Sequence, residues 1–124
     1  MLLNNLYTIE SSECSPAGDK ITFEILLNKE HALFRGHFPG NPILPGVCTV
    51  QIIRELLEVQ LGKAFRLVRA GNIKYLGFIN PLTEALVRFE LLIGHTGAGT
   101  TGCQATVSAR GIVRCSFKGE YGEE

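Results

Sequence analysis

Alternation of hydrophobic and polar positions along the chain predicts a sheet of β-strands. It is clearest in residues 20–27 and 85–93, where every second residue is large and apolar. This spacing is typical of strands with one buried face, since neighbouring side chains of a strand point to opposite sides. We expect further strands over residues 2–9, 66–76 with a break at Gly71, 103–109 and 112–118. The last two form a hairpin around Arg110 and Gly111.

One segment, residues 47–61, has helical rather than strand periodicity and ends at the helix-stopping Gly62. Its apolar positions cover most of the helix, and a polar stripe holds Gln51, Arg54, Glu55 and Glu58. Such a stripe is typical of a solvent-exposed face. We expect a turn at 15–19, a flexible connection over 94–102 and a frayed tail at 119–124. The pattern predicts an α+β fold, an antiparallel sheet wrapped on a single helix.

Length and composition narrow the class of protein. A chain of 124 residues is expected to be a single domain spanning 1–124. Its 12 basic and 12 acidic residues balance, which argues against nucleic acid as a partner. Its four cysteines show no metal-site or redox spacing, so no metal and no cofactor is expected. No signal peptide or membrane span is evident, which predicts a cytoplasmic protein with reduced thiols.

Three of the five prolines fall within residues 36–46, immediately before the predicted helix. Proline fixes φ and restricts the residue before it, so this segment is expected to be a stiff extended connector. It carries one ionisable side chain, His37, and it ends at Gly46, where free backbone N–H groups at a helix start favour developing negative charge. A rigidly held histidine beside such a helix end suits proton abstraction next to a carbonyl. The segment therefore predicts an enzyme site.

The run His37-Phe38-Pro39-Gly40-Asn41-Pro42-Ile43-Leu44-Pro45-Gly46-Val47 resembles the signature of the 3-hydroxyacyl-[acyl-carrier-protein] dehydratases of fatty acid synthesis. The resemblance implies a hot-dog fold, and the predicted order of strands and helix agrees with it along nearly the whole chain. It also implies a hydro-lyase that forms a trans-2-enoyl thioester, an acyl carrier protein as partner, and a dimer. Where family members carry Pro-Gly-Asp, this chain has Pro81-Leu82-Thr83-Glu84.

The resemblance also implies catalytic roles. His37 would remove the Cα proton, and the Gly46 N–H would hold the thioester oxygen. The family's acidic residue, fourteen positions after the histidine and acting across the dimer interface, corresponds to Gln51. An amide cannot deliver a proton at neutral pH. Glu55 lies four residues later on the same helix face, where many family members carry a glutamine.

Several alternatives stay open from the sequence. In one alternative, Glu55 protonates the leaving hydroxyl directly or through a water. In another, His37 performs both proton transfers. In the third, Glu55 has no catalytic role and only pairs with Arg54 or solvent. Three functions are compatible with the sequence: a dehydratase, a catalytically weak partner subunit that binds the acyl thioester beside an active dehydratase, and a thioesterase on the same fold. The dimer is a homodimer or a heterodimer with a related subunit.

Overall fold

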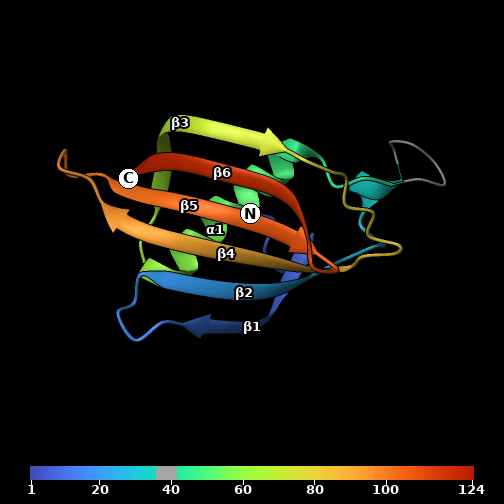
Figure 1. Ribbon diagram of the computed structural model, residues 1–124. Coiled ribbons are helices and arrows are strands. Elements are labelled where there is room, and N and C mark those ends of the chain that lie inside the picture. The colour runs from blue at the N-terminus through green and yellow to red at the C-terminus, as the bar shows by residue number, and fades with distance from the viewer. Residues whose placement is uncertain (36–41) are drawn as a thin grey trace.

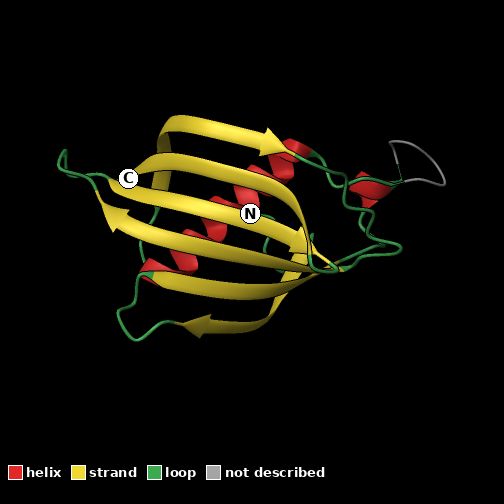
Figure 2. Ribbon diagram, in the orientation of Figure 1, coloured by secondary structure: helices red, strands yellow, loops and turns green. Residues whose placement is uncertain are grey.

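An antiparallel sheet curves around one long helix in the computed structural model, which describes residues 1–35 and 42–124 (Figure 1). Within these ranges the elements are β1 (Tyr7–Cys14), β2 (Lys20–Leu27), the short 3₁₀-helix η1 (Ala32–Phe34), α1 (Gly46–Leu61), β3 (Phe65–Tyr75), β4 (Leu86–His95), β5 (Thr101–Ala109) and β6 (Ile112–Glu123). Figure 2 shows the helix lying along the concave face of the sheet. The predicted α+β architecture is confirmed.

The six strands of the described chain follow the order β1-β2-β4-β5-β6-β3, and all neighbours are antiparallel. Strand β3 therefore forms one edge of the sheet, although it precedes β4, β5 and β6 in the sequence. Among the described strands it pairs with β6 alone, and it carries two bulges, one before and one after residues 69–70. Bulges are common on edge strands, where they increase the local twist.

The hydrophobic core lies between the helix and the inner face of the sheet. Ile52, Ile53, Leu56 and Leu57 are fully buried on α1 and belong to one cluster with the alternating apolar residues of the strands. Burying one such side chain contributes about 1.5–3 kcal/mol. The helix stops where predicted, because Gly62 adopts a left-handed conformation (φ 66°) and donates to the Glu58 carbonyl at 2.8 Å.

The N-terminal strand begins later than predicted. Residues 2–6 form a turn in which the Leu2 carbonyl accepts from the backbone N–H groups of Asn5 and Leu6, and Asn4 takes a left-handed conformation (φ 66°). Strand β1 starts at Tyr7, whose ring is fully buried. The apolar Leu2 and Leu3 are instead partly buried against the core cluster, so their spacing did not report a strand.

The C-terminal segment also differs from the prediction. Residues 119–123 continue β6 between β5 and β3 rather than fraying, because Tyr121 is buried and packs edge-on against Phe65 at a ring separation of 6.4 Å. The connection expected over 94–102 is shorter than predicted, since Gly94 and Gly102 already pair across β4 and β5. No helix of the described residues is long and apolar enough to span a membrane.

Candidate functional site

The helix start at Gly46 carries uncapped backbone N–H groups. Pro45 is the N-cap residue and offers no side-chain acceptor, while its carbonyl accepts from the N–H groups of Cys48 and Thr49. Among the described residues, no acceptor is found for the Gly46 N–H. An exposed amide at the positive end of a helix dipole is suited to binding an oxygen that gains negative charge.

A pocket of about 500 Å³ opens beside this helix start. Residues 43–47 form one wall, residues 75–79 lie opposite, and Arg114 and Cys115 come from β6. The lining is mostly apolar, and Val47 and Phe78 leave about three quarters of their surface exposed at its edge. The Leu44 N–H donates to the Ile79 carbonyl at 2.9 Å and joins the two walls. This arrangement suits a chain that is apolar apart from one polar end.

Tyr75 fills the space in front of Gly46. A Cβ atom added to Gly46 would lie 2.7 Å from two carbons of the Tyr75 ring and 2.9 Å from its hydroxyl oxygen. Real Cβ contacts of this length are essentially absent from proteins, so a side chain at position 46 would require the Tyr75 ring, which is more than half exposed, to move away. Burial, with the nearby Cys115 as a further cause, raises the pKa of the Tyr75 phenol. The hydroxyl therefore stays protonated at neutral pH.

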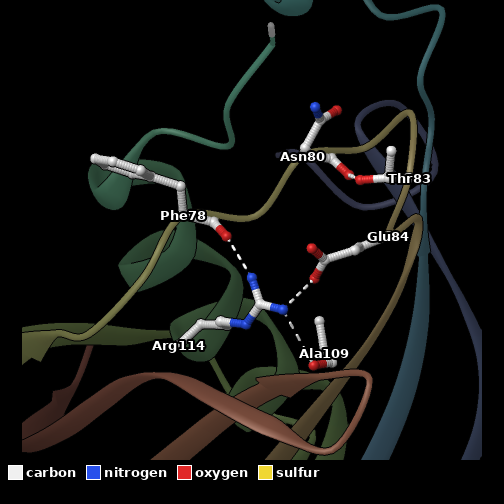
Figure 3. Close-up of polar contacts among 6 residues, drawn as sticks. All are labelled: Phe78, Asn80, Thr83, Glu84, Ala109 and Arg114. Carbon is white, nitrogen blue, oxygen red and sulfur yellow. Dashed lines mark hydrogen bonds and ion pairs between the residues drawn. The ribbon is translucent and has the colours of Figure 1, made fainter.

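Arg114 binds the segment of residues 75–79, which lines the pocket (Figure 3). Its guanidinium donates to the Phe78 carbonyl at 2.6 Å and to the Ala109 carbonyl at 3.4 Å, and it lies 2.6 Å from a Glu84 carboxylate oxygen. Both charged side chains are only 12% exposed. Because that Glu84 oxygen has no aligned hydrogen bond, the contact is best described as an ion pair.

A bulge in β6 directs Arg114 to this position. Val107 lies opposite Cys115 and Ser108 lies opposite Val113, so Arg114 has no partner residue on β5. Bulges re-aim a side chain in this way. The backbone carbonyl of Arg114 accepts from the N–H groups of Leu76 at 2.8 Å and Gly77 at 3.2 Å, which ties the segment after β3 to β6.

Gln51 and Glu55 are in contact further along the helix, about one and a half and two and a half turns after Gly46. The Gln51 amide nitrogen donates to the Glu55 carboxylate at 2.9 Å. The same carboxylate accepts from the backbone N–H groups of Leu2 (2.9 and 3.2 Å) and Leu3 (2.9 Å) and from the Tyr7 hydroxyl (3.0 Å). Glu55 is completely buried and forms neither a pair with Arg54 nor a contact with solvent.

This network keeps Glu55 ionised. Burial alone raises its pKa, but the hydrogen bonds from Leu2, Gln51, Tyr7 and Leu3 outweigh burial and hold the pKa below its ordinary value. Burial and the adjacent carboxylate raise the pKa of the Tyr7 phenol, which therefore remains a donor. A carboxylate that is ionised at neutral pH holds no proton to deliver.

The predicted site residues are brought together only in part. Gly46, Gln51 and Glu55 share one helix, and Gly46 lines the pocket whereas the other two do not. His37 lies outside the described residues. A larger pocket of about 850 Å³ lies at the opposite end of the sheet, around His95 and Lys118, and contains none of the predicted residues. Its lining mixes charges of both signs, so we place the candidate site at the helix start.

Sequence reasoning missed three residues of this site: Tyr75, Glu84 and Arg114. Glu84 was visible only as a departure from the expected Pro-Gly-Asp, and Arg114 as a charge beside a predicted hairpin. Their contact joins positions thirty residues apart through a bulge, and alternation of hydrophobic positions carries no signal for a bulge.

Comparison with protein families gives a match to the ApeI-like family, described as ApeI dehydratase, over residues 13–98. Among curated proteins, the 3-hydroxyacyl-[acyl-carrier-protein] dehydratase FabZ of Levilactobacillus brevis is 29% identical over 130 aligned positions, covering 93% of this chain and 83% of that protein. FabZ of Lactiplantibacillus plantarum is 27% identical over 96 positions, covering 70% of this chain. That match spans 63% of the relative's own length.

Solved structures show the same fold. "The Dehydratase Heterocomplex ApeI:P from Xenorhabdus doucetiae" matches with a TM-score of 0.71 and 17% identity, over 91% of this chain and 95% of that one. The putative thioesterase yhdA from Lactococcus lactis matches with a TM-score of 0.68 and 11% identity, over 96% and 94% of the two chains. These likenesses confirm the hot-dog fold.

Proposed function

The chain belongs to the ApeI-like dehydratase family, and from this premise we propose that it removes water from a 3-hydroxyacyl thioester carried on an acyl carrier protein. The product is the trans-2-enoyl thioester. The observation that supports this most is the pocket beside the uncapped helix start, which offers an apolar channel and an amide donor at one place. The curated relatives are 3-hydroxyacyl-[acyl-carrier-protein] dehydratases, which suggests the substrate class.

In this proposal the thioester oxygen lies against the Gly46 N–H. His37 removes a proton from Cα, and the negative charge that develops on the thioester oxygen is stabilised by this amide and the helix dipole. The electron pair of the broken C–H bond forms the double bond between Cα and Cβ as the Cβ–O bond breaks. The hydroxyl leaves as water once it receives a proton.

That proton comes from the His37 imidazolium in our proposal. Gln51 cannot supply a proton, because an amide does not ionise near neutral pH. The lowered pKa of Glu55 and its full set of hydrogen bonds argue against Glu55 as the acid. The imidazolium formed in the first step carries a proton, so the transfers balance without a second acid. Glu55 then positions Gln51 and anchors the N-terminal turn.

A second subunit is part of the proposal. Strand β3 presents a free edge with Leu67 and Val68 about half exposed, and Val47 and Phe78 are exposed at the pocket. An open edge beside apolar surface favours pairing with another chain. A structural neighbour is described as a dehydratase heterocomplex, which makes a related subunit as reasonable a partner as a second copy.

One observation favours a second candidate function. With an amide at position 51 and an ionised Glu55, the described part of the site offers no proton donor of carboxylic type. A catalytically weak subunit that binds the acyl thioester beside an active partner needs the same apolar pocket and the same open edge, but it needs no proton donor. A thioesterase is less favoured, since it would need a carboxylate to activate water, and Gln51 removes that group.

Mass spectrometry on 3-hydroxyacyl carrier proteins of several chain lengths tests these candidates. Dehydration predicts the loss of one water from the carrier-bound acyl group, and this loss should disappear in His37→Ala. The matched control is His95→Ala, which removes an exposed histidine at the other end of the sheet. Release of free acid would contradict the proposal in favour of a thioesterase. An unchanged mass together with measurable binding would favour the partner subunit.

A further inference from the structure

The Tyr75 hydroxyl lies beside the backbone of Gly46 at the start of the helix. The ring of Tyr75 packs on the backbone of Gly46, and its hydroxyl oxygen is 2.9 Å from the position of a Cβ on that residue. Both residues line the pocket of about 500 Å³. An oxygen atom bound by the Gly46 N–H would therefore be within reach of the Tyr75 hydroxyl.

This hydroxyl is free to bind a ligand. Among the described residues, none forms a hydrogen bond with it, and the Tyr75 side chain is more than half exposed. Its backbone is nevertheless fixed. Tyr75 pairs with Cys115 on β6, and the next two N–H groups donate to the carbonyl of Arg114. Because Arg114 is itself held by Glu84 and the Phe78 carbonyl, the aromatic ring projects from a rigid support.

We propose that the Tyr75 hydroxyl is a second hydrogen-bond donor to the thioester oxygen, next to the Gly46 N–H. This inference rests on the proposed function, because it assigns a further donor to the same site. As Cα loses its proton, negative charge moves onto the thioester oxygen, and both donors stabilise it more strongly than in the ground state. Tyr75 forms no covalent bond and keeps its proton throughout.

The competing explanation is that Tyr75 only packs against Gly46. A phenylalanine would fill that space equally well, so Tyr75→Phe separates the two explanations by removing one oxygen atom. If the hydroxyl acts as proposed, Tyr75→Phe lowers kcat by roughly 10²-fold, the scale found for one oxyanion donor, while KM changes little. If Tyr75 only packs, kcat and KM both stay at the wild-type values, and the proposal is wrong.

Tyr121→Phe is the matched control. The Tyr121 hydroxyl is buried and has no hydrogen-bond partner in the described structure, and Tyr121 does not line the pocket. Its removal is expected to leave kcat unchanged. Equal losses of kcat in both variants would point to a general effect of losing a phenol and would contradict a specific role for Tyr75.

A binding measurement keeps this inference separate from the proposed function. Hexanoyl-pantetheine labelled with ¹³C at the thioester carbonyl lacks the 3-hydroxyl and cannot be dehydrated, so its carbonyl stretch can be followed by infrared difference spectroscopy when it is bound. We expect a shift to lower frequency with the wild type and with Tyr121→Phe, and a smaller shift with Tyr75→Phe. An equal shift in all three proteins would overturn the role of Tyr75 and leave the proposed function intact. Failure of the wild type to bind the thioester would overturn both.

Discussion

Replacing Glu55 by glutamine should destabilise the protein, and the hydrogen bonds of the carboxylate set the size of the effect. Five donor contacts converge on its two oxygens. A glutamine side chain of the same shape has one oxygen and one NH₂ group. If its oxygen stays near the Leu3 N–H and the Tyr7 hydroxyl, its NH₂ group faces the Leu2 N–H and the Gln51 amide nitrogen, which are also donors. Gln51 can turn its amide over, but the Leu2 N–H cannot change.

The loss is therefore the shorter, 2.9 Å contact of the Leu2 N–H, which keeps only its 3.2 Å contact to the remaining oxygen, together with the charge assistance of all the hydrogen bonds. An unsatisfied donor costs about 1–3 kcal/mol and a hydrogen bond to a charged group contributes about 1.5–3 kcal/mol, so we expect Glu55→Gln to lower the free energy of unfolding by roughly 2–4 kcal/mol. For a domain of this size that corresponds to a fall in Tm of about 10 °C. Denaturation at fixed protein concentration measures it, with the exposed Glu30→Gln as control.

The pH dependence tests whether the carboxylate is ionised. The pKa of Glu55 is lowered in the folded state, so its contribution to stability is fully present above the ordinary value of 4.5. That contribution is lost as the pH falls through the folded pKa, because protonation removes the charge. The difference in stability between wild type and Glu55→Gln should therefore stay constant from pH 7 down to about pH 4.5 and shrink as the pH falls further. A difference that stays constant below pH 4.5 as well would refute an ionised Glu55 and return it to consideration as the acid.

Three further changes address the site directly. Gln51→Glu places a carboxyl group against an ionised carboxylate, which raises the pKa of the new group. The rate of dehydration should then increase by up to the contribution of a general acid, on the order of 10²–10⁴-fold. Unchanged turnover with intact thioester binding would favour the partner-subunit function. Gly46→Ala brings a methyl group to 2.7 Å from the outer end of the Tyr75 side chain, which is more than half exposed, so we expect the ring to move away. The free energy of unfolding, measured by urea denaturation, should then fall by no more than about 1 kcal/mol, and a loss near ~3 kcal/mol would mean that the ring cannot move. Arg114→Met leaves the largely buried Glu84 without its partner and should lower the free energy of unfolding, measured by urea denaturation, by about 3–5 kcal/mol. An equal loss when a solvent-exposed arginine is replaced would contradict a specific role for this ion pair.

Much of the fold was predictable because it depends on local alternation. Strand β2 and helix α1 were found within a residue or two, and Gly62 ended the helix as expected. The C-terminal part of β6 was missed, since Tyr121 stands between glycines and acquires its partners Phe65 and Phe117 only in the folded state. Contacts between residues that are far apart in the sequence leave no periodic pattern of hydrophobic positions.

In the candidate site, too, features that depend on the local sequence were predicted, whereas features that depend on distant contacts were not. Gly46 was placed at the helix start by the proline segment before it. Glu55 was expected on a polar stripe, but its environment depends on the backbone of Leu2 and Leu3, and a backbone donor leaves no mark in a pattern of side chains. His37 lies outside the described residues, so its role as the base stays a prediction.

The placement of β3 has a consequence for the order in which the chain acquires its structure. Strand β3 is made before β4, β5 and β6, yet among the described strands it pairs only with β6, which comes after β4 and β5 in the sequence. Residues 65–75 therefore stay without this strand partner until β6 has been made. Before β6 is made, a segment that contains Leu67 and Val68 is prone to aggregate, and the positive charges of Arg66, Arg69 and Lys74 oppose the aggregation of such incomplete chains. We therefore expect the basic residues of β3 to limit aggregation of the growing chain until β6 has paired with β3.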